Sequence, residues 1–96
     1  MSMKEAYEKK LQAQLDEMSA EIDKIKAKAS ESEADAQLKY HKEIEELEAK
    51  QKTANKKLDE LKESGDDAWE DLKAGADNAW DSLSKSVKSA MSRFRS

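Results

Sequence analysis

The chain has 96 residues, of which 42% are charged and 36% hydrophobic; its net charge is −4 and it contains neither proline nor cysteine. A chain of this size forms at most one small domain, and so little apolar material does not enclose a catalytic cleft. The lack of cysteine excludes disulfides, thiolate metal sites and cysteine nucleophiles. The net negative charge argues against nucleic acid as a partner. We therefore expect a protein that is not an enzyme and holds no cofactor.

The composition is that of long helices. Ala, Glu, Lys, Leu and Arg make up 53 of the 96 residues, which is typical of coiled coils, whereas Leu, Ile, Val and Phe together number only 13. Either the chain is disordered or its few apolar residues are arranged along one edge of each helix. No segment is apolar enough to span a membrane, and the first residues lack the apolar core of a signal peptide. We predict an all-α, cytoplasmic protein, with association at a membrane surface as the alternative.

Residues 1–63 carry a heptad seam, meaning an apolar edge with alternating steps of three and four residues. The seam runs from Leu15 to Ala36 and again from Ile44 to Leu61. Between the two runs, over residues 36–44, two steps of four form a stutter, which locally unwinds a supercoil without breaking the helix. We therefore predict one coiled-coil helix over residues 1–63. Its predicted interface residues are Leu15, Met18, Ile22, Ile25, Tyr40, Ile44, Leu47, Leu58 and Leu61.

A turn near Ser30 is the alternative. The stretch from Lys28 to Ala34 contains no large apolar residue, and Ser30 with Glu33 matches a capping box. A turn there would divide the chain into three helices of similar length, the layout of a three-helix bundle. We favour the uninterrupted helix, because the alanine-rich stretch has high helix propensity and no strong breaker. Such a helix also implies self-association, since the shorter C-terminal helix cannot cover it along its whole length.

A turn over residues 64–66 separates this helix from a second one, predicted over residues 67–95. Gly65 suits the left-handed cap that ends a helix, and the aspartates after it suit the start of the next. An eleven-residue repeat follows, in which Ala precedes Trp or Met and then, three residues later, Leu or Phe. Eleven residues in three turns keep an apolar stripe nearly straight along the helix. We predict that this amphipathic helix folds back as a helical hairpin through Trp69, Leu72, Trp80, Leu83, Val87, Met91 and Phe94.

The polar face of the C-terminal helix changes sign along its length. The charged residues of 66–81 are acidic except for Lys73, whereas residues 82–96 hold Lys85, Lys88, Arg93 and Arg95 and no acid. The helix dipole favours this distribution, because it stabilises acids at the start of a helix and bases at its end. An amphipathic tail that meets an anionic lipid surface has the same pattern. The charge gradient is therefore consistent with both roles.

Four segments carry a resemblance to known proteins: residues 4–7 (KEAY), 23–29 (DKIKAKA), 44–50 (IEELEAK) and 68–73 (AWEDLK). Together they resemble a group of small bacterial coiled-coil proteins of unassigned function, which implies a helical fold and no particular activity. The eleven-residue repeats are similar to those of exchangeable apolipoproteins over about the last thirty residues, without the proline between repeats. The second resemblance implies binding to a lipid surface.

One pair of residues has metal-ligand spacing. His41, the single histidine, lies one helical turn before Glu45. A structural metal site needs about four ligands and a catalytic one about three, so we expect a solvated surface histidine and no metal site. We therefore predict a structural or adaptor protein that acts through helix–helix self-association, as a homo-oligomer, or by binding a helical partner protein. The alternative is peripheral binding to a membrane or lipid surface through the C-terminal amphipathic helix.

Overall fold

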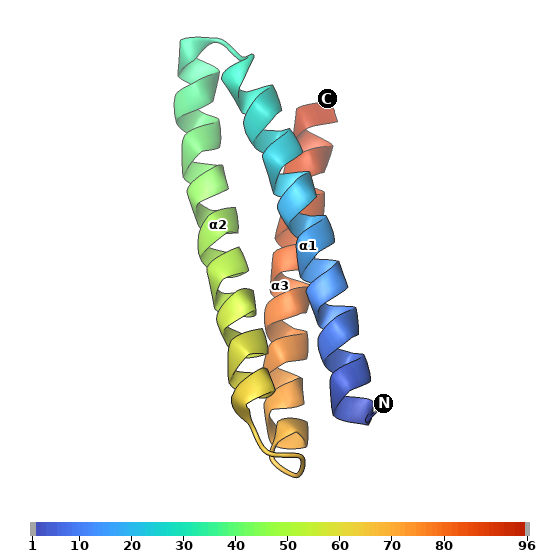
Figure 1. The fold of residues 1–96 in the computed structure, drawn as a ribbon. Helices are drawn as coiled ribbons and strands as arrows, with labels where there is room; N and C mark the ends of the chain where they lie inside the picture. Colours follow the sequence, from blue (N-terminus) through green and yellow to red (C-terminus); the bar gives the residue numbers. More distant parts are fainter. Residues whose placement is uncertain (1, 96) are drawn as a thin grey trace.

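Three helices run alternately up, down and up in the computed structural model, which describes residues 2–95 and side chains as far as Arg93 (Figure 1). Helix α1 spans Met3–Ser30, α2 spans Ala34–Glu63 and α3 spans Trp69–Arg95. They pack lengthwise into a rod with extents of 51 × 19 × 17 Å. Residues 2–95 contain no strand, so the prediction of an all-α fold is confirmed.

The uninterrupted helix over residues 1–63 is wrong, because α1 ends at Ser30 and α2 begins at Ala34. The structure has the alternative arrangement, with a turn between them. The capping box is not used: Ser30 is the last residue of α1, and its hydroxyl donates to the Ala27 carbonyl at 2.7 Å. Instead the Gln37 side-chain amide donates to the carbonyls of Ser30 and Ser32, at 3.1 and 2.7 Å. The turn lets the two runs of the seam pack against each other, which buries more apolar surface than a continuous helix in one chain can.

The two runs of the seam form most of the core within a single chain. Met18 and Tyr40 of the seam are half-buried. Leu11, which the sequence pattern did not include, extends the buried edge by one further turn toward the N-terminus. The seam can therefore be covered without a second chain, and the argument for self-association from an uncovered long helix no longer holds. The buried residues of α1 and α2 are Leu11, Leu15, Ile22, Ile25, Ala29, Ile44, Leu47, Ala54, Leu58 and Leu61.

The predicted turn after residue 63 is present, although it is longer than expected and α3 begins at Trp69. Gly65 does not adopt the left-handed conformation, because neither glycine has a positive φ. Helix α2 closes on Ser64 instead, whose N–H and hydroxyl both donate to the Leu61 carbonyl, at 3.2 and 2.5 Å. The Gly65 carbonyl then accepts the N–H groups of Ala68 and Trp69, which starts the first turn of α3. Gly65 therefore joins the two helices without a special backbone conformation.

The apolar stripe of α3 closes the bundle against both other helices. Its buried residues are Trp69, Ala76, Leu83, Val87 and Ala90, with Leu83 fully buried near the middle of the helix. Helix α3 contacts α2 more extensively than it contacts α1. As Figure 1 shows, α3 stops short of the turn between α1 and α2, so the end of that hairpin extends beyond it.

Candidate interaction surfaces

Most of the predicted interface residues lie inside the bundle rather than on its surface. Ten of them are buried: Leu15, Ile22, Ile25, Ile44, Leu47, Leu58, Leu61, Trp69, Leu83 and Val87. Met18, Tyr40, Leu72, Trp80 and Met91 are half-buried, and the side chain of Phe94 lies outside the described part of the chain. Candidate contact surfaces are therefore found along the edges between helices, where partly exposed apolar side chains remain.

The first edge lies between α1 and α3. At the starts of these two helices, a cluster of polar and aromatic side chains joins them. The Tyr7 ring lies 5.9 Å from the Trp69 ring, and its hydroxyl donates to the Asp77 carboxylate. The Lys73 ammonium lies 5.5 Å from the centre of the Tyr7 ring. Burial, and then the hydrogen bond and negative charge of Asp77, raise the pKa of the Tyr7 phenol above its usual range. This cluster is a contact within the bundle.

Farther along the same two helices, an open groove lies between α1 and α3. Its apolar floor is made by Met18 of α1 and by Val87 and Met91 of α3, and it encloses about 440 Å³. Acidic residues of α1, Glu17 and Glu21, line one side, whereas Lys88 and Ser92 of α3 line the other. We call this surface the α1–α3 groove. It combines an apolar floor with two edges of opposite charge.

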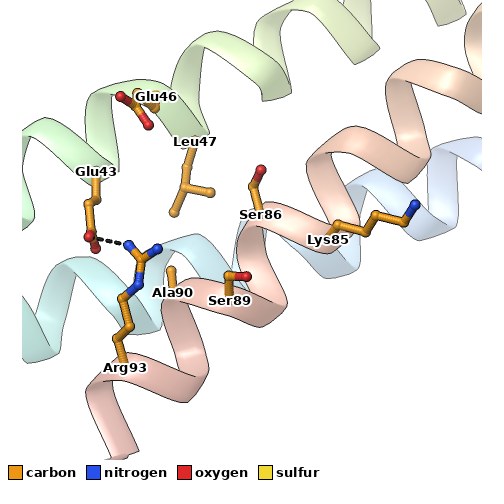
Figure 2. Close-up of a pocket in the computed structure, with 8 residues that line it drawn as sticks. All are labelled: Glu43, Glu46, Leu47, Lys85, Ser86, Ser89, Ala90 and Arg93. Carbon is orange, nitrogen blue, oxygen red and sulfur yellow. Dashed lines mark hydrogen bonds and ion pairs between the residues drawn. The ribbon is translucent and has the colours of Figure 1, made fainter.

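A second groove, between α2 and α3, is polar. Figure 2 shows it lined by Glu43 and Glu46 of α2 and by Lys85 and Arg93 of α3, with the Arg93 guanidinium donating to the Glu43 carboxylate. Ser86 also lines this groove, and its hydroxyl accepts a hydrogen bond from the Lys50 ammonium at 2.5 Å. The groove encloses about 230 Å³, and one ion pair and one hydrogen bond join its two sides. It therefore joins α2 to α3 more than it offers a binding site.

The bases at the end of α3 are matched by acids within the bundle. Lys85 and Arg93 line the groove that contains Glu43 and Glu46, and Lys88 lines the groove that contains the glutamates of α1. The side chain of Arg95 lies outside the described residues. Because α2 and α3 are antiparallel, Glu43 and Glu46, in the first half of α2, lie beside the basic end of α3. The ion pair between Arg93 and Glu43 adds to the helix dipole in favouring bases at the end of α3.

The fourth surface is the end of the α1–α2 hairpin, which we call the tip. A shallow hollow of about 590 Å³ on this hairpin is lined by Ala29, Ser30, Ala34, Gln37, Leu38, His41 and Ile44. Leu38 stands at its edge and is 75% exposed. The sequence pattern missed this residue because it lies off the heptad seam. A leucine outside an otherwise regular seam is the signal that could have identified it.

The candidate metal pair lies at the tip but has no third ligand. The His41 Nε2 atom lies 3.0 Å from a Glu45 carboxylate oxygen, and both side chains are more than half exposed. Residues 2–95 contain no group of three His, Cys, Asp or Glu side chains arranged to hold a metal ion. The geometry is that of a solvated contact between two side chains along one helix.

Comparisons with protein-family models, with curated proteins and with solved structures found no match to this chain. The resemblances to small coiled-coil proteins and to apolipoprotein repeats therefore stay predictions. Within the described part of the chain, no helix has both the length and the apolar character required to cross a membrane.

Proposed function

We propose that this chain is a non-enzymatic adaptor module that binds an amphipathic helix of a partner protein in the α1–α3 groove. The observation that carries the proposal is the groove itself, with Met18, Val87 and Met91 along its floor. Helix-in-groove binding needs such an apolar channel between two helices, into which the apolar edge of a third helix fits. Methionine suits this role because its flexible, polarisable side chain adapts to different partner surfaces. A cytoplasmic location is part of the proposal and rests on composition alone.

The charges beside the groove specify the chemistry of the partner helix. Glu17 and Glu21 lie along the α1 side, and Lys88 lies along the α3 side. A partner helix that fits has basic residues on one flank of its apolar edge and an acidic residue on the other. Opposite charges across an interface fix orientation and speed association more than they add affinity. The wrong orientation would place like charges together.

The alternative of lipid binding needs a larger change in the protein. The stripe of α3 that would insert into a membrane is the one that closes the bundle, through residues such as Trp69, Leu83 and Val87. These side chains would have to leave the core before they could meet a lipid surface. Binding a helix in the α1–α3 groove needs no such opening, and this difference favours a protein partner.

A photo-crosslinking experiment tests the proposal. A photoreactive amino acid replaces Met91 in the full chain, and in the control it replaces Asn55, an exposed residue of α2. We expect the photoreactive group at position 91 to form a crosslink with a helical segment of a partner protein. The group at position 55 should not crosslink to that segment. A synthetic peptide of that segment should then bind the unmodified chain, and Lys88→Glu, which leaves the core intact, should weaken the binding about tenfold.

Two outcomes would overturn the proposal. Equal capture from both positions would show that the groove has no role. Peptide binding that is unaffected by both Lys88→Glu and Met18→Glu would place the contact elsewhere. A further measurement is flotation of the chain with anionic vesicles. If the chain bound the vesicles and crosslinked to no helical segment, the result would support the lipid alternative.

A further inference from the structure

The tip carries an apolar projection and an apolar hollow side by side. Leu38 projects from α2 with 75% of its surface exposed, and the hollow next to it includes the small side chains of Ala29 and Ala34. Ile44 forms part of the same hollow and is itself almost fully buried. Because α3 ends before it reaches the turn between α1 and α2, this end of the rod consists of two helices only (Figure 1).

We propose that the tip is a self-association surface, through which two copies of this chain pair about a two-fold axis near Leu38. In a two-fold pair the same patch serves both copies, so a surface must be complementary to itself. A projection beside a hollow meets that requirement, because Leu38 of each copy can enter the alanine-lined hollow of the other. The tip is separate from the α1–α3 groove, and this proposal does not depend on the adaptor function.

The charges around Leu38 favour a second copy of this chain as the molecule that binds the tip. They also favour an antiparallel arrangement of the two α2 helices. Asp35 lies three residues before Leu38 and Lys42 lies four residues after it, which places both on the same side of the helix as Leu38. All three side chains are exposed. When two α2 helices cross antiparallel about Leu38, Asp35 of each copy lies beside Lys42 of the other. A parallel pair would instead place Asp35 beside Asp35 and Lys42 beside Lys42.

Three further charges near the tip follow the same order, whereas Lys28 and Glu45 do not. Glu31 and Glu33 come before Leu38, in the turn and at the start of α2, whereas Lys39 comes directly after it. The acidic end of the patch and its basic end are thus separated by the apolar centre. An antiparallel pair matches the ends, because the acidic end of one copy meets the basic end of the other. The patch is small, and small interfaces of this kind give weak, concentration-dependent association.

Sedimentation equilibrium of the full chain, from about one micromolar to about one millimolar, measures this association. We expect a reversible dimer with twice the 10.9 kDa mass of one chain. Leu38→Lys should raise the dissociation constant at least about tenfold, while the helical content measured by circular dichroism stays unchanged. Asn55→Lys, at an exposed site in the middle of α2, is the matched control and should leave the dimer unchanged.

Charge exchange tests the antiparallel direction. Asp35→Lys alone and Lys42→Glu alone should each weaken the dimer, and the two together should restore it, because the exchanged charges again meet with opposite sign. The chain contains no cysteine, so Leu38→Cys adds a single thiol close to the proposed axis. It should form a disulfide-linked dimer on mild oxidation, whereas Asn55→Cys should not.

The proposal is overturned if the chain remains a monomer at millimolar concentration or if the dimer persists in Leu38→Lys. Equal oxidation of the two cysteine variants would also contradict it. A dimer that is lost in Lys88→Glu but kept in Leu38→Lys would place self-association in the α1–α3 groove. Loss of peptide capture with an intact dimer would refute only the adaptor function, so failure of the two proposals can be told apart.

Discussion

Replacing Leu83 by alanine should remove a large part of the stability of the bundle. Leu83 lies near the middle of α3 and is 0% exposed, so none of its surface is in contact with water. At about 0.8 kcal/mol for each of roughly three carbon atoms removed, the transfer contribution is about 2.4 kcal/mol. The cavity left behind adds to this, and we expect a total loss of about 3 kcal/mol. A domain of this length has a free energy of unfolding of about 5 to 14 kcal/mol, so the loss is a substantial fraction.

Leu38→Ala is the matched control, because it makes the same chemical change where the leucine is 75% exposed. It should change the free energy of unfolding by less than about 0.5 kcal/mol at concentrations where the chain is monomeric. Urea unfolding followed by circular dichroism measures both variants, and the parent midpoint at low concentration should not depend on chain concentration. Equal losses in the two variants, or a loss below about 1 kcal/mol for Leu83→Ala, would refute the burial of the α3 stripe within one chain.

Three further substitutions test separate features. Gly75→Ala should raise the free energy of unfolding, measured in urea, by about 1 kcal/mol, since a Cβ at this position in α3 meets open space. A decrease would contradict the position of Gly75 within a helix. Gln37→Ala should reduce the free energy of unfolding by about 1 kcal/mol and so lower the melting temperature, because it removes the two hydrogen bonds from the Gln37 amide to the first turn. An unchanged melting temperature would show that the turn does not need these bonds. Because the pKa of the Tyr7 phenol is raised in the folded chain, the unfolded chain loses the phenol proton at a lower pH than the folded chain does. The stability that this phenol contributes is therefore complete below the usual pKa near 10 and declines as the pH rises above it. As the pH is raised from about 9 to about 11, the free energy of unfolding of Tyr7→Phe should therefore fall less than that of the parent. Equal decreases in the two proteins would contradict the raised pKa.

The sequence pattern predicted the helical edges well, because those predictions rest on periodicity. Ile22, Ile25, Leu58 and Leu61 were placed on one seam by their spacing, and all four are almost completely buried. Leu83 was placed on the α3 stripe in the same way and is also buried. Spacing determines which side of a helix an apolar residue occupies whatever the partner is, so the edges could be assigned before the arrangement of the helices was known.

The sequence indicated a turn near Ser30 only as the alternative to an uninterrupted helix, because the local signals there are weak. Residues 31–33 are Glu, Ser and Glu, which a helix accepts at little cost, and the capping pattern at Ser30 is not the one that the structure uses. The turn is stabilised by packing between residues distant in the sequence, which buries residues such as Ile25 between the helices, and by the nearby Gln37 amide. Tertiary packing of this kind overrides helix propensity, which differs by only a few tenths of a kcal/mol among ordinary residues.

The turn also changes where a partner can bind. A heptad seam does not specify whether the helix that covers it belongs to the same chain or to another. Here α1, α2 and α3 have 28, 30 and 27 residues, and they cover one another except at the tip, which α3 does not reach. The apolar residues that remain accessible are therefore those that the packing leaves partly or largely exposed, such as Met18 and Met91 in the groove and Leu38 at the tip. Binding partners are accordingly to be sought at these two surfaces, and substitutions in the seams should affect folding first and association only as a consequence.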